Sequence, residues 1–266
     1  MKLKRPAIRY HGGKWLLAPW IIQHFPEHRC YVEPFGGGAS VLLRKSRSYA
    51  EVYNDLDSEL CNLFRVLREC GSELAQQLEL TPFARAEFVK SHDQSGNAIE
   101  QARRTVVRSF MGFGSNSHNK PTGFRSNSNR SGTTPAHDWA NYPKNLQALI
   151  ERLQGVVIEN RDAVEVMTQH DTEDTLHYVD PPYVPETRDK GLDYRHEMTI
   201  DQHVALSASL KSMQGSVLVS GYNSELYNDL YAGWFRVDRN SFADGARKRV
   251  EVLWMNRKTK QQALPL

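Results

Sequence analysis

Residues 175–183 read Thr-Leu-His-Tyr-Val-Asp-Pro-Pro-Tyr, and this stretch is the most informative in the chain for fold and chemistry. The apolar run before Asp180 predicts a short buried strand. Pro181 and Pro182 allow neither a helix nor further sheet pairing, because proline has no N–H and a fixed φ. The strand therefore ends in a rigid corner that presents a carboxylate, a free backbone carbonyl and the Tyr183 ring. In open α/β sheets, ligands bind at this carboxyl edge of the strands.

Such a corner suits chemistry on an exocyclic amino group of a heteroaromatic ring. The lone pair of adenine's 6-amino nitrogen is delocalised into the ring, which makes it a poor nucleophile. If the Asp180 carboxylate and the Pro181 carbonyl each accept one amino hydrogen, the nitrogen becomes pyramidal and its lone pair points at an electrophile. Tyr183 offers a face on which a planar base can stack. A bare Asp-Pro-Pro-Tyr is at least as often a turn with a capping aspartate, so this interpretation needs support from other segments.

A glycine-rich turn upstream gives that support. Residues 33–40 read Glu-Pro-Phe-Gly-Gly-Gly-Ala-Ser, between a predicted strand at 29–32 and a helix-like stretch at 41–45. Strand, glycine-rich turn and helix together let a ligand approach the backbone closely. The turn lacks the G-x-G-x-x-G pattern and the Lys-Ser/Thr pair of a P-loop, so alone it is a weak signal and phosphate binding is disfavoured. Asp55 follows the next predicted strand, 22 residues after Glu33, near the spacing at which a carboxylate meets ribose hydroxyls.

The amino terminus supplies a further segment. Residues 10–14 read Tyr-His-Gly-Gly-Lys and predict a turn that ends in a cation. An amphipathic helix follows, with these side chains on one side: Leu16, Leu17, Trp20, Ile21 and Phe25. Taken alone, Lys14 is more often a solvated lysine at the start of a helix.

In this order the four segments resemble the Dam family, DNA adenine methyltransferases that use S-adenosylmethionine and place the cofactor motifs before the recognition region and the catalytic motif. The resemblance spans nearly the whole chain. It implies an α/β fold: a Rossmann-like methyltransferase sheet with helices on both faces, formed by residues 1–57 and 151–266. It further implies an inserted, mostly α target-recognition domain with a basic loop over residues 58–150. Within it, Ser58 is predicted to cap a helix, and residues 82–90 and 99–110 predict others.

The family's site residues carry over onto matching positions. The resemblance implies a catalytic role for Asp180, Pro181, Pro182 and Tyr183. It implies cofactor contacts by Tyr10, Gly12, Lys14, Glu33, Pro34, Phe35, Gly36, Gly37, Gly38, Asp55 and Asp180. Residues 250–256 resemble the family's closing strand, which is structural. The sequence predicts a closing β pair between residues 234–237 and 250–254. Asp162, at the end of a strand predicted over 155–158, either reaches the cofactor's adenine or caps the next helix.

The charge distribution favours DNA as the partner. The chain has a net charge of +3, yet residues 101–137 contain no Asp or Glu and six cationic side chains. A long Gly/Ser/Asn-rich loop of this kind is typically either functional or simply solvated. Lys and Arg bind phosphates, whereas Arg, Asn and Ser read base edges. We therefore predict DNA contacts by Arg108, Asn116, Lys120, Phe124, Arg125 and Arg130. Among these, Arg125 is predicted to read a base, Phe124 to wedge or stack, and Arg108 and Arg130 to touch phosphate.

Composition agrees with this prediction. At 266 residues, 39% hydrophobic and 24% charged, the chain suits one α/β domain with a small insertion. No apolar run approaches the ~20 residues of a membrane span, and the start lacks a signal core, so we expect a monomer in the cytoplasm of a bacterial cell or phage-infected host. Cys30, Cys61 and Cys70 form no C-x-x-C pair. Neither a disulfide framework nor a metal site is indicated.

The resemblance implies methyl transfer from S-adenosylmethionine to the 6-amino nitrogen of an adenine flipped out of duplex DNA. Similar corners serve methyltransferases that act on other amino groups, such as an RNA base or cytosine, or protein glutamine with Asn in place of Asp. A DNA-binding regulator that kept the fold and lost turnover is the alternative from another class. Intact Lys14, Asp55 and Asp180 argue against such a regulator. The target sequence does not follow from these motifs, and GATC is a default by association with the family.

Overall fold

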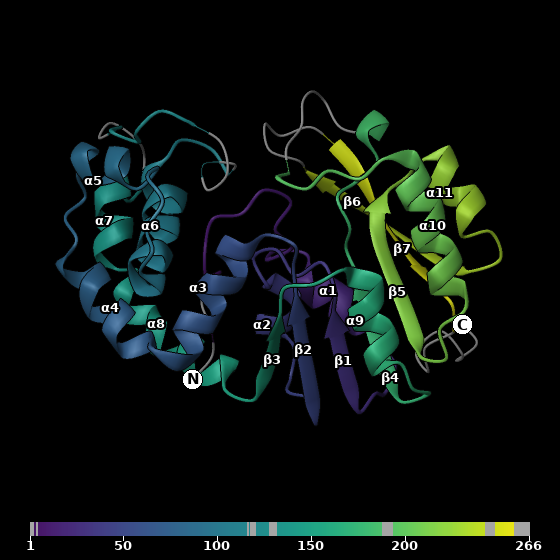
Figure 1. The fold of residues 1–266 in the computed structure, drawn as a ribbon. Helices are drawn as coiled ribbons and strands as arrows, with labels where there is room; N and C mark the ends of the chain where they lie inside the picture. Colours follow the sequence, from purple (N-terminus) through teal and green to yellow (C-terminus); the bar gives the residue numbers. More distant parts are fainter. Residues whose placement is uncertain are drawn as a thin grey trace.

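A mixed sheet of seven strands forms the centre of the computed structural model, which describes residues 3, 5–115, 117, 121–127, 132–187, 194–242 and 248–257. The strand order is β3-β2-β1-β4-β5-β7-β6, and the strands from β1 to β5 are parallel, whereas β7 runs antiparallel to both its neighbours (Figure 1). The strands are β1 (Cys30–Glu33), β2 (Ala50–Asn54), β3 (Val156–Glu159), β4 (Thr175–Val179), β5 (Ser216–Tyr222), β6 (Phe235–Phe242) and β7 (Lys248–Met255).

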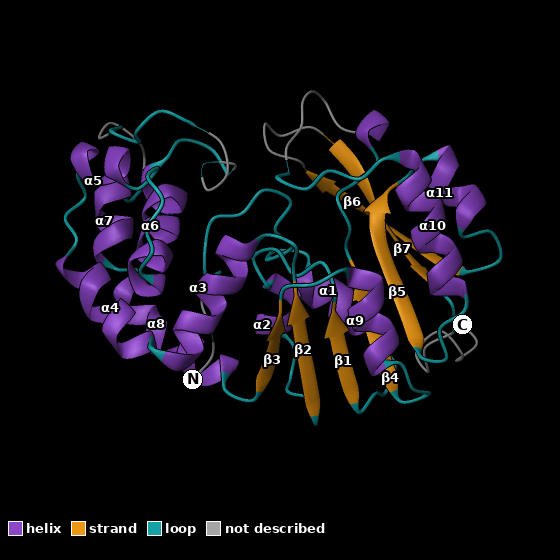
Figure 2. Ribbon diagram, in the orientation of Figure 1, coloured by secondary structure: helices purple, strands orange, loops and turns teal. Residues whose placement is uncertain are grey.

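Helices cover both faces of this sheet (Figure 2). One face carries α1 (Ala18–Gln23) and α2 (Ser40–Arg44), and the other carries α9 (Ala163–His170), α10 (Ile200–Lys211) and α11 (Glu225–Leu230). Successive strand residues point to opposite faces, so Tyr31 and Val32 belong to two different hydrophobic clusters. The predicted sheet with helices on both faces is confirmed in this form and fits a methyltransferase fold.

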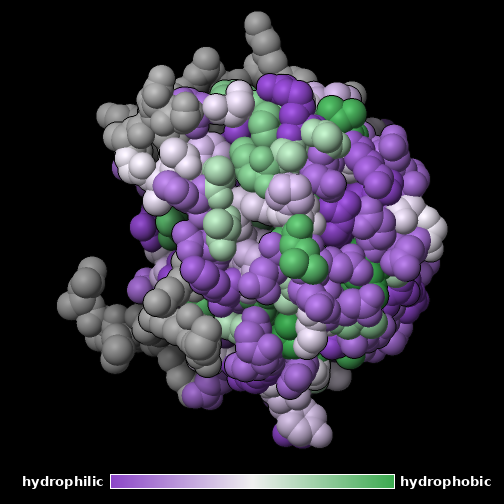
Figure 3. All heavy atoms as spheres, turned by 90° about the vertical axis from the view of Figure 1, so that its left-hand side faces the viewer, coloured by the Kyte–Doolittle hydropathy of each residue, from purple (hydrophilic) through white to green (hydrophobic). Residues whose placement is uncertain are grey.

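Between β2 and β3 the chain forms a group of helices to one side of the sheet (Figure 1). These are α3 (Ser58–Glu69), α4 (Gly71–Leu80), α5 (Arg85–Lys90), α6 (Ala98–Met111), α7 (Pro135–Ala140) and α8 (Leu146–Leu153), with a short 3-10 turn at Pro143–Asn145. Val106 and Trp139 of this group share one continuous buried cluster with Tyr31 and Tyr53 of the sheet. The outer face of the group is mainly hydrophilic, with apolar residues scattered over it (Figure 3). An independent recognition domain over residues 58–150 stays a prediction.

Local details correct several predicted boundaries. Asp57, not Ser58, caps α3: its carboxylate accepts a hydrogen bond from the Glu59 N–H at 2.9 Å, and an anion there also complements the helix dipole. Leu16 is 85% exposed, because α1 begins two residues later, at Ala18. Among the described residues, no helix is both long and apolar enough to cross a membrane.

The turn between β1 and α2 requires glycine at position 36. Its N–H donates to the carbonyl of Asn54 at 2.8 Å, and a Cβ added to Gly36 would lie 2.1 Å from Cε2 of Tyr53. Tyr53 is fully buried and donates its hydroxyl to the Gly37 carbonyl at 2.8 Å, so its ring has no room to move away. The glycine-rich turn and β2 are therefore packed directly against each other.

We expect Gly36→Ala to lower the free energy of unfolding by about 1–3 kcal/mol, the usual cost of overpacking a tight core. Gly96→Ala is the matched control, since a Cβ there meets nothing within 4 Å, and its effect should stay within about 0.5 kcal/mol. Urea unfolding of both variants measures the difference. Equal midpoints for Gly36→Ala and wild type would contradict this packing argument.

Candidate active site at the carboxyl edge of the sheet

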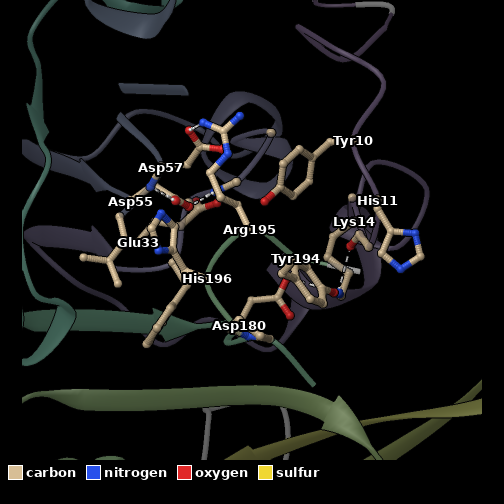
Figure 4. A pocket seen from close by; sticks show the side chains of 18 of the residues that line it. Tyr10, His11, Lys14, Glu33, Asp55, Asp57, Asp180, Tyr194, Arg195 and His196 are labelled. Atoms are coloured by element: carbon tan, nitrogen blue, oxygen red, sulfur yellow. Dashed lines mark hydrogen bonds and ion pairs between the residues drawn. The ribbon is translucent and has the colours of Figure 1, made fainter. Parts of the chain in front are cut away.

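The candidate site is a pocket where the strand order reverses, between the carboxyl ends of β1 and β4. This switch point is the usual ligand site of open α/β sheets. The structure brings all four predicted segments to its walls (Figure 4). Lining residues that the sequence predicted are Tyr10, Gly12, Lys14, Glu33, Phe35, Gly36, Gly37, Gly38, Asp55, Asp180 and Pro182. Pro34, Pro181, Tyr183 and Asp162 are not among the lining residues.

Lys14 is a buried cation inside the site. It is only 6% exposed, its Nζ lies 3.0 Å from Oδ2 of Asp180, and it donates to the Gly12 carbonyl at 2.9 Å. Burial lowers the pKa of Lys14, but the charges of Asp180 and Glu251 outweigh it and hold this pKa above its usual value. Lys14 is therefore charged at neutral pH and is not a solvated lysine at the start of a helix.

The Asp180 carboxylate is held from two sides. Lys14 contacts Oδ2, and Ser220 on the adjacent strand β5 donates its hydroxyl to Oδ1 at 2.7 Å. The Ser220 hydroxyl is itself 3.1 Å from the hydroxyl of Tyr178. These contacts orient the carboxylate at the carboxyl end of β4 in the absence of substrate.

Tyr183 differs from its predicted role as a stacking surface. Its ring is 4% exposed, its hydroxyl donates to the Glu251 carboxylate, and Lys14 Nζ lies 4.5 Å from the ring centroid. The ring of Tyr222 meets it edge to face at 4.7 Å. Because these neighbours enclose the ring, the structure does not present Tyr183 as a surface for a base.

Two further carboxylates in the pocket have raised pKa values. Burial raises the pKa of Glu33 to about 8, even though Tyr31 Oη and the Leu42 N–H donate to its Oε2 at 2.7 and 2.9 Å. Burial also raises the pKa of Asp55 to about 6, opposed by hydrogen bonds from the Gly37 and Asp57 N–H groups, each 2.8 Å long. At neutral pH, Asp55 is thus mostly ionised and Glu33 mostly protonated.

The sequence motifs missed one wall of the pocket. Residues 194–198, which follow the corner at residues 180–183, line it together with the motif residues. Arg195 pairs with Asp57 at 2.9 Å and lies 3.4 Å from Glu59, and Figure 4 shows it beside Asp57. No spacing rule identifies this segment, because its position depends on how the chain folds back over the pocket. Ser220 and the Glu251 side chain were missed for the same reason.

Asp162 is placed by its hydrogen bonds. Its Oδ1 accepts from the N–H groups of Val164 and Glu165 at 2.9 and 3.2 Å, which makes it the N-cap of α9. Of the two roles considered from the sequence, the structure shows the cap.

The basic segment after α6 is only partly as predicted. Arg108 is 4% exposed and pairs with Glu59 inside the helical group, which corrects its assignment to DNA phosphate because the charge is already paired and buried. Phe124 packs on Phe83, with ring centroids 5.1 Å apart, and so is not a free wedge. The Arg125 guanidinium donates to the Phe110 carbonyl at 3.1 Å. Asn116, Lys120 and Arg130 lie outside the described residues.

The start of this segment returns on itself as a short hairpin. The Phe113 N–H donates to the Gly123 carbonyl at 2.8 Å, and the Arg125 N–H donates to the Met111 carbonyl at 2.7 Å. Phe113 is 72% exposed at this point. The basic loop is thus attached directly to the end of α6.

Cysteines and candidate metal ligands can be located in the part of the chain that the structure describes. Cys30, Cys61 and Cys70 are free thiols. Among the described residues, no cluster of three or more His, Cys, Asp or Glu side chains could hold a metal ion. His177 is buried, pairs with Asp171 at 3.0 Å and is not among the residues that line the pocket.

Comparison with known proteins agrees with the geometry. The family described as D12 class N6 adenine-specific DNA methyltransferase matches residues 10–242. A DNA adenine methylase of Haemophilus influenzae is 27% identical over 94% of this chain and 92% of its own length, and that of Escherichia coli K12 is 25% identical over 95% of both. The type II methyltransferase M1.LlaDCHI of Lactococcus lactis is 25% identical over 85% of this chain and 84% of its own length. These matches do not favour the RNA-base, cytosine or silent-regulator alternatives, and the chain belongs to the D12 class of N6 adenine-specific DNA methyltransferases.

Proposed function

We propose that this protein acts as a monomer on duplex DNA and uses S-adenosylmethionine to methylate the 6-amino nitrogen of an adenine flipped out of the helix. The observation that carries the proposal is the Asp180 carboxylate, held by Lys14 and Ser220 beside a glycine-rich pocket at the switch point of the sheet. Its family membership supports N6-adenine methylation of DNA as the activity.

The pocket fits a nucleoside cofactor that carries positive charge. Asp55 presents an ionised carboxylate at the end of β2, where it can accept hydrogen bonds from ribose hydroxyls. At Gly37, φ is +47°, a value that favours glycine and lets a ligand meet bare backbone. The lining acids, which include Asp55, Asp57 and Asp180, complement a sulfonium. When bound, the cofactor supplies an electrophilic methyl group.

Asp180 and the Pro181 carbonyl are the acceptors for the amino group. A carboxylate offers about four lone-pair sites, and Lys14 and Ser220 occupy one on each oxygen. Asp180 therefore keeps acceptor capacity for an amino hydrogen. Accepting these hydrogens favours a pyramidal nitrogen and directs its lone pair, so positioning does much of the catalysis. A neutral aromatic amine is far less acidic than a carboxylic acid, so Asp180 need not remove a proton before the attack.

The adenine amino group is unreachable inside a stacked duplex, so the nucleotide must leave the helix. The basic loop that starts at Gly112 supplies the contacts that select the site. Within it, Arg125 stays our candidate for reading a base, since a guanidinium fork matches the two acceptors of guanine.

Asp180→Ala tests the catalytic assignment. We expect methyl transfer to be abolished while DNA affinity stays within a few fold, because the carboxylate acts on the amino group and not on the DNA backbone. Transfer of a labelled methyl group to unmethylated genomic DNA measures turnover, and fluorescence anisotropy measures binding. A folded Asp180→Ala protein with near-normal turnover would contradict the catalytic role of Asp180.

Asp55 tests the cofactor assignment through pH. Its ionised form binds the ribose hydroxyls, so affinity for S-adenosylmethionine should be full well above the carboxyl pKa of about 6 and fall as the pH drops through it. Asp55→Asn should weaken binding by about 1.5–3 kcal/mol at high pH, the scale of hydrogen bonds to a charged group, and remove this part of the pH dependence.

Calorimetry from about pH 5 to 8 measures both effects, and a shift of one pKa unit corresponds to about 1.4 kcal/mol. Asp162→Asn is the control, because Asp162 is exposed and caps α9; its cofactor affinity should match wild type. If Asp55→Asn binds the cofactor as wild type does at every pH, the ribose site lies elsewhere.

Arg125 tests specificity. If its guanidinium reads a guanine through two hydrogen bonds, Arg125→Ala loses about 1–3 kcal/mol of discrimination at one base pair. Lys120→Ala should instead weaken binding to all duplexes alike and flatten the salt dependence. Affinity and methylation rate on a target duplex and its single-base variants, at two salt concentrations, separate the two. Equal losses on every duplex would make Arg125 a phosphate contact.

A further inference from the structure

A buried acid on the closing strand contacts the catalytic corner, and the mechanism above does not use it. Glu251 lies in the middle of β7, where it pairs with Tyr222 of β5 on one side and Arg239 of β6 on the other. It is 2% exposed. An acid in the interior of a sheet is costly unless it is paired, so its partners indicate its role.

Both partners of Glu251 belong to the active site. Tyr183 donates its hydroxyl to Oε1 of Glu251, and Lys14 Nζ lies 3.7 Å from the same oxygen. Burial raises the pKa of Glu251, and Lys14 and Tyr183 oppose this rise. Lys14 also contacts Asp180 at 3.0 Å and lies over the Tyr183 ring. Glu251 is therefore joined directly to one end of the corner and through Lys14 to the other.

The corner needs such contacts because its own backbone cannot hold it. β4 ends at Val179, and Pro181 and Pro182 have no N–H to donate to a neighbouring strand. What restrains the corner is side-chain bonding at its two ends. Asp180 is held by Ser220 and Lys14, and Tyr183 is held by Glu251.

We propose that Glu251 is a positioning residue for the methyl-transfer reaction: by holding the Tyr183 hydroxyl it fixes the far end of the corner, and so sets where the Asp180 carboxylate and the Pro181 carbonyl meet the amino group. The inference rests on the proposed function. It gives Tyr183 a role that agrees with its burial, as the anchored end of the corner.

Removal of the anchor should slow chemistry without weakening binding. Glu251→Ala is expected to reduce the single-turnover methylation rate about 10- to 100-fold, the scale on which small misplacements of reacting groups act. Affinities for S-adenosylmethionine and for a duplex with the methylated site should change less than about threefold. Glu251→Gln should recover most of the rate, because its amide oxygen still accepts a hydrogen bond from the Tyr183 hydroxyl.

Tyr183→Phe removes the same hydrogen bond from its other partner, so it tests the inference even if Glu251→Ala does not fold. It should slow the reaction to a similar degree, and the double variant should be no slower than the slower single one, because both changes break one interaction. Asp238→Asn is the matched control: this acid lies on β6 of the same hairpin, paired with Arg236, and its side chain is 46% exposed. Its rate should equal that of wild type.

Several results overturn the inference. Full rates for Glu251→Ala or Tyr183→Phe would show that the anchor is not needed, and a rate that falls only in step with cofactor affinity would assign Glu251 to the cofactor site. If the fold reductions in rate of the two single variants multiply in the double variant, Glu251 does not act through its bond to Tyr183. A Glu251→Gln variant as slow as Glu251→Ala would exclude that action as well. If the wild-type protein methylates no adenine, the proposed function is overturned, and this inference with it. The results for the variants are each measured against an active wild type, so they test the inference separately.

Discussion

The buried cation of Lys14 and the partly exposed carboxylate of Asp180 form an ion pair, 3.0 Å between Nζ and Oδ2, where the amino-terminal turn meets the carboxyl end of β4. Two charges taken out of water together offset much of their desolvation cost, but either one alone leaves an uncompensated buried charge. The pair therefore joins two distant parts of the chain. Loss of either partner would leave the charge of the other uncompensated. The turn at residues 10–14, the corner after β4 and strand β5, whose Ser220 also holds Asp180, are all arranged around it.

The charges around this pair explain why the pocket suits a cation. Glu33, Asp55 and Asp180 line one pocket together with the buried Lys14, and burial raises the pKa of Glu33 to about 8 and that of Asp55 to about 6. A carboxylate with a raised pKa gains from any positive charge that enters its surroundings, because that charge favours the ionised form. The pocket thus favours a positively charged ligand, such as the proposed sulfonium cofactor, and a neutral ligand of the same shape gains less from these acids.

Much of this site could be predicted from the sequence, because three of its four motifs lie at the ends of strands β1, β2 and β4. Parallel strands bring their carboxyl ends to one edge, so Glu33, Asp55 and Asp180 had to come close together once the three strands were recognised. The strands themselves were recognisable from short apolar runs bounded by turns. What could not be predicted is which polar side chains are already paired.

Arg108 shows the reason for that limit. Its place in a segment without acids suggested phosphate binding, yet its partner Glu59 lies 49 residues earlier, on another helix. Local charge density says nothing about a pair of that separation. Phe124 and Tyr183 were misjudged in the same way, since both aromatic rings were taken to be exposed, whereas tertiary packing half-buries Phe124 and buries Tyr183.

Because Arg108 is buried and paired, it holds the helix that precedes the basic loop in place. Its pair with Glu59 fixes α6 against α3, and the basic loop begins directly at the end of α6, with Arg125 bonded back to Met111. Glu59 also lies 3.4 Å from Arg195, in the segment that lines the pocket. Side chains that read bases are effective when rigid elements hold their supports in place. One carboxylate therefore contacts both the helix that carries the basic loop and the wall of the pocket, so a buried contact, and not the loop itself, sets the distance between the proposed DNA contacts and the proposed chemistry.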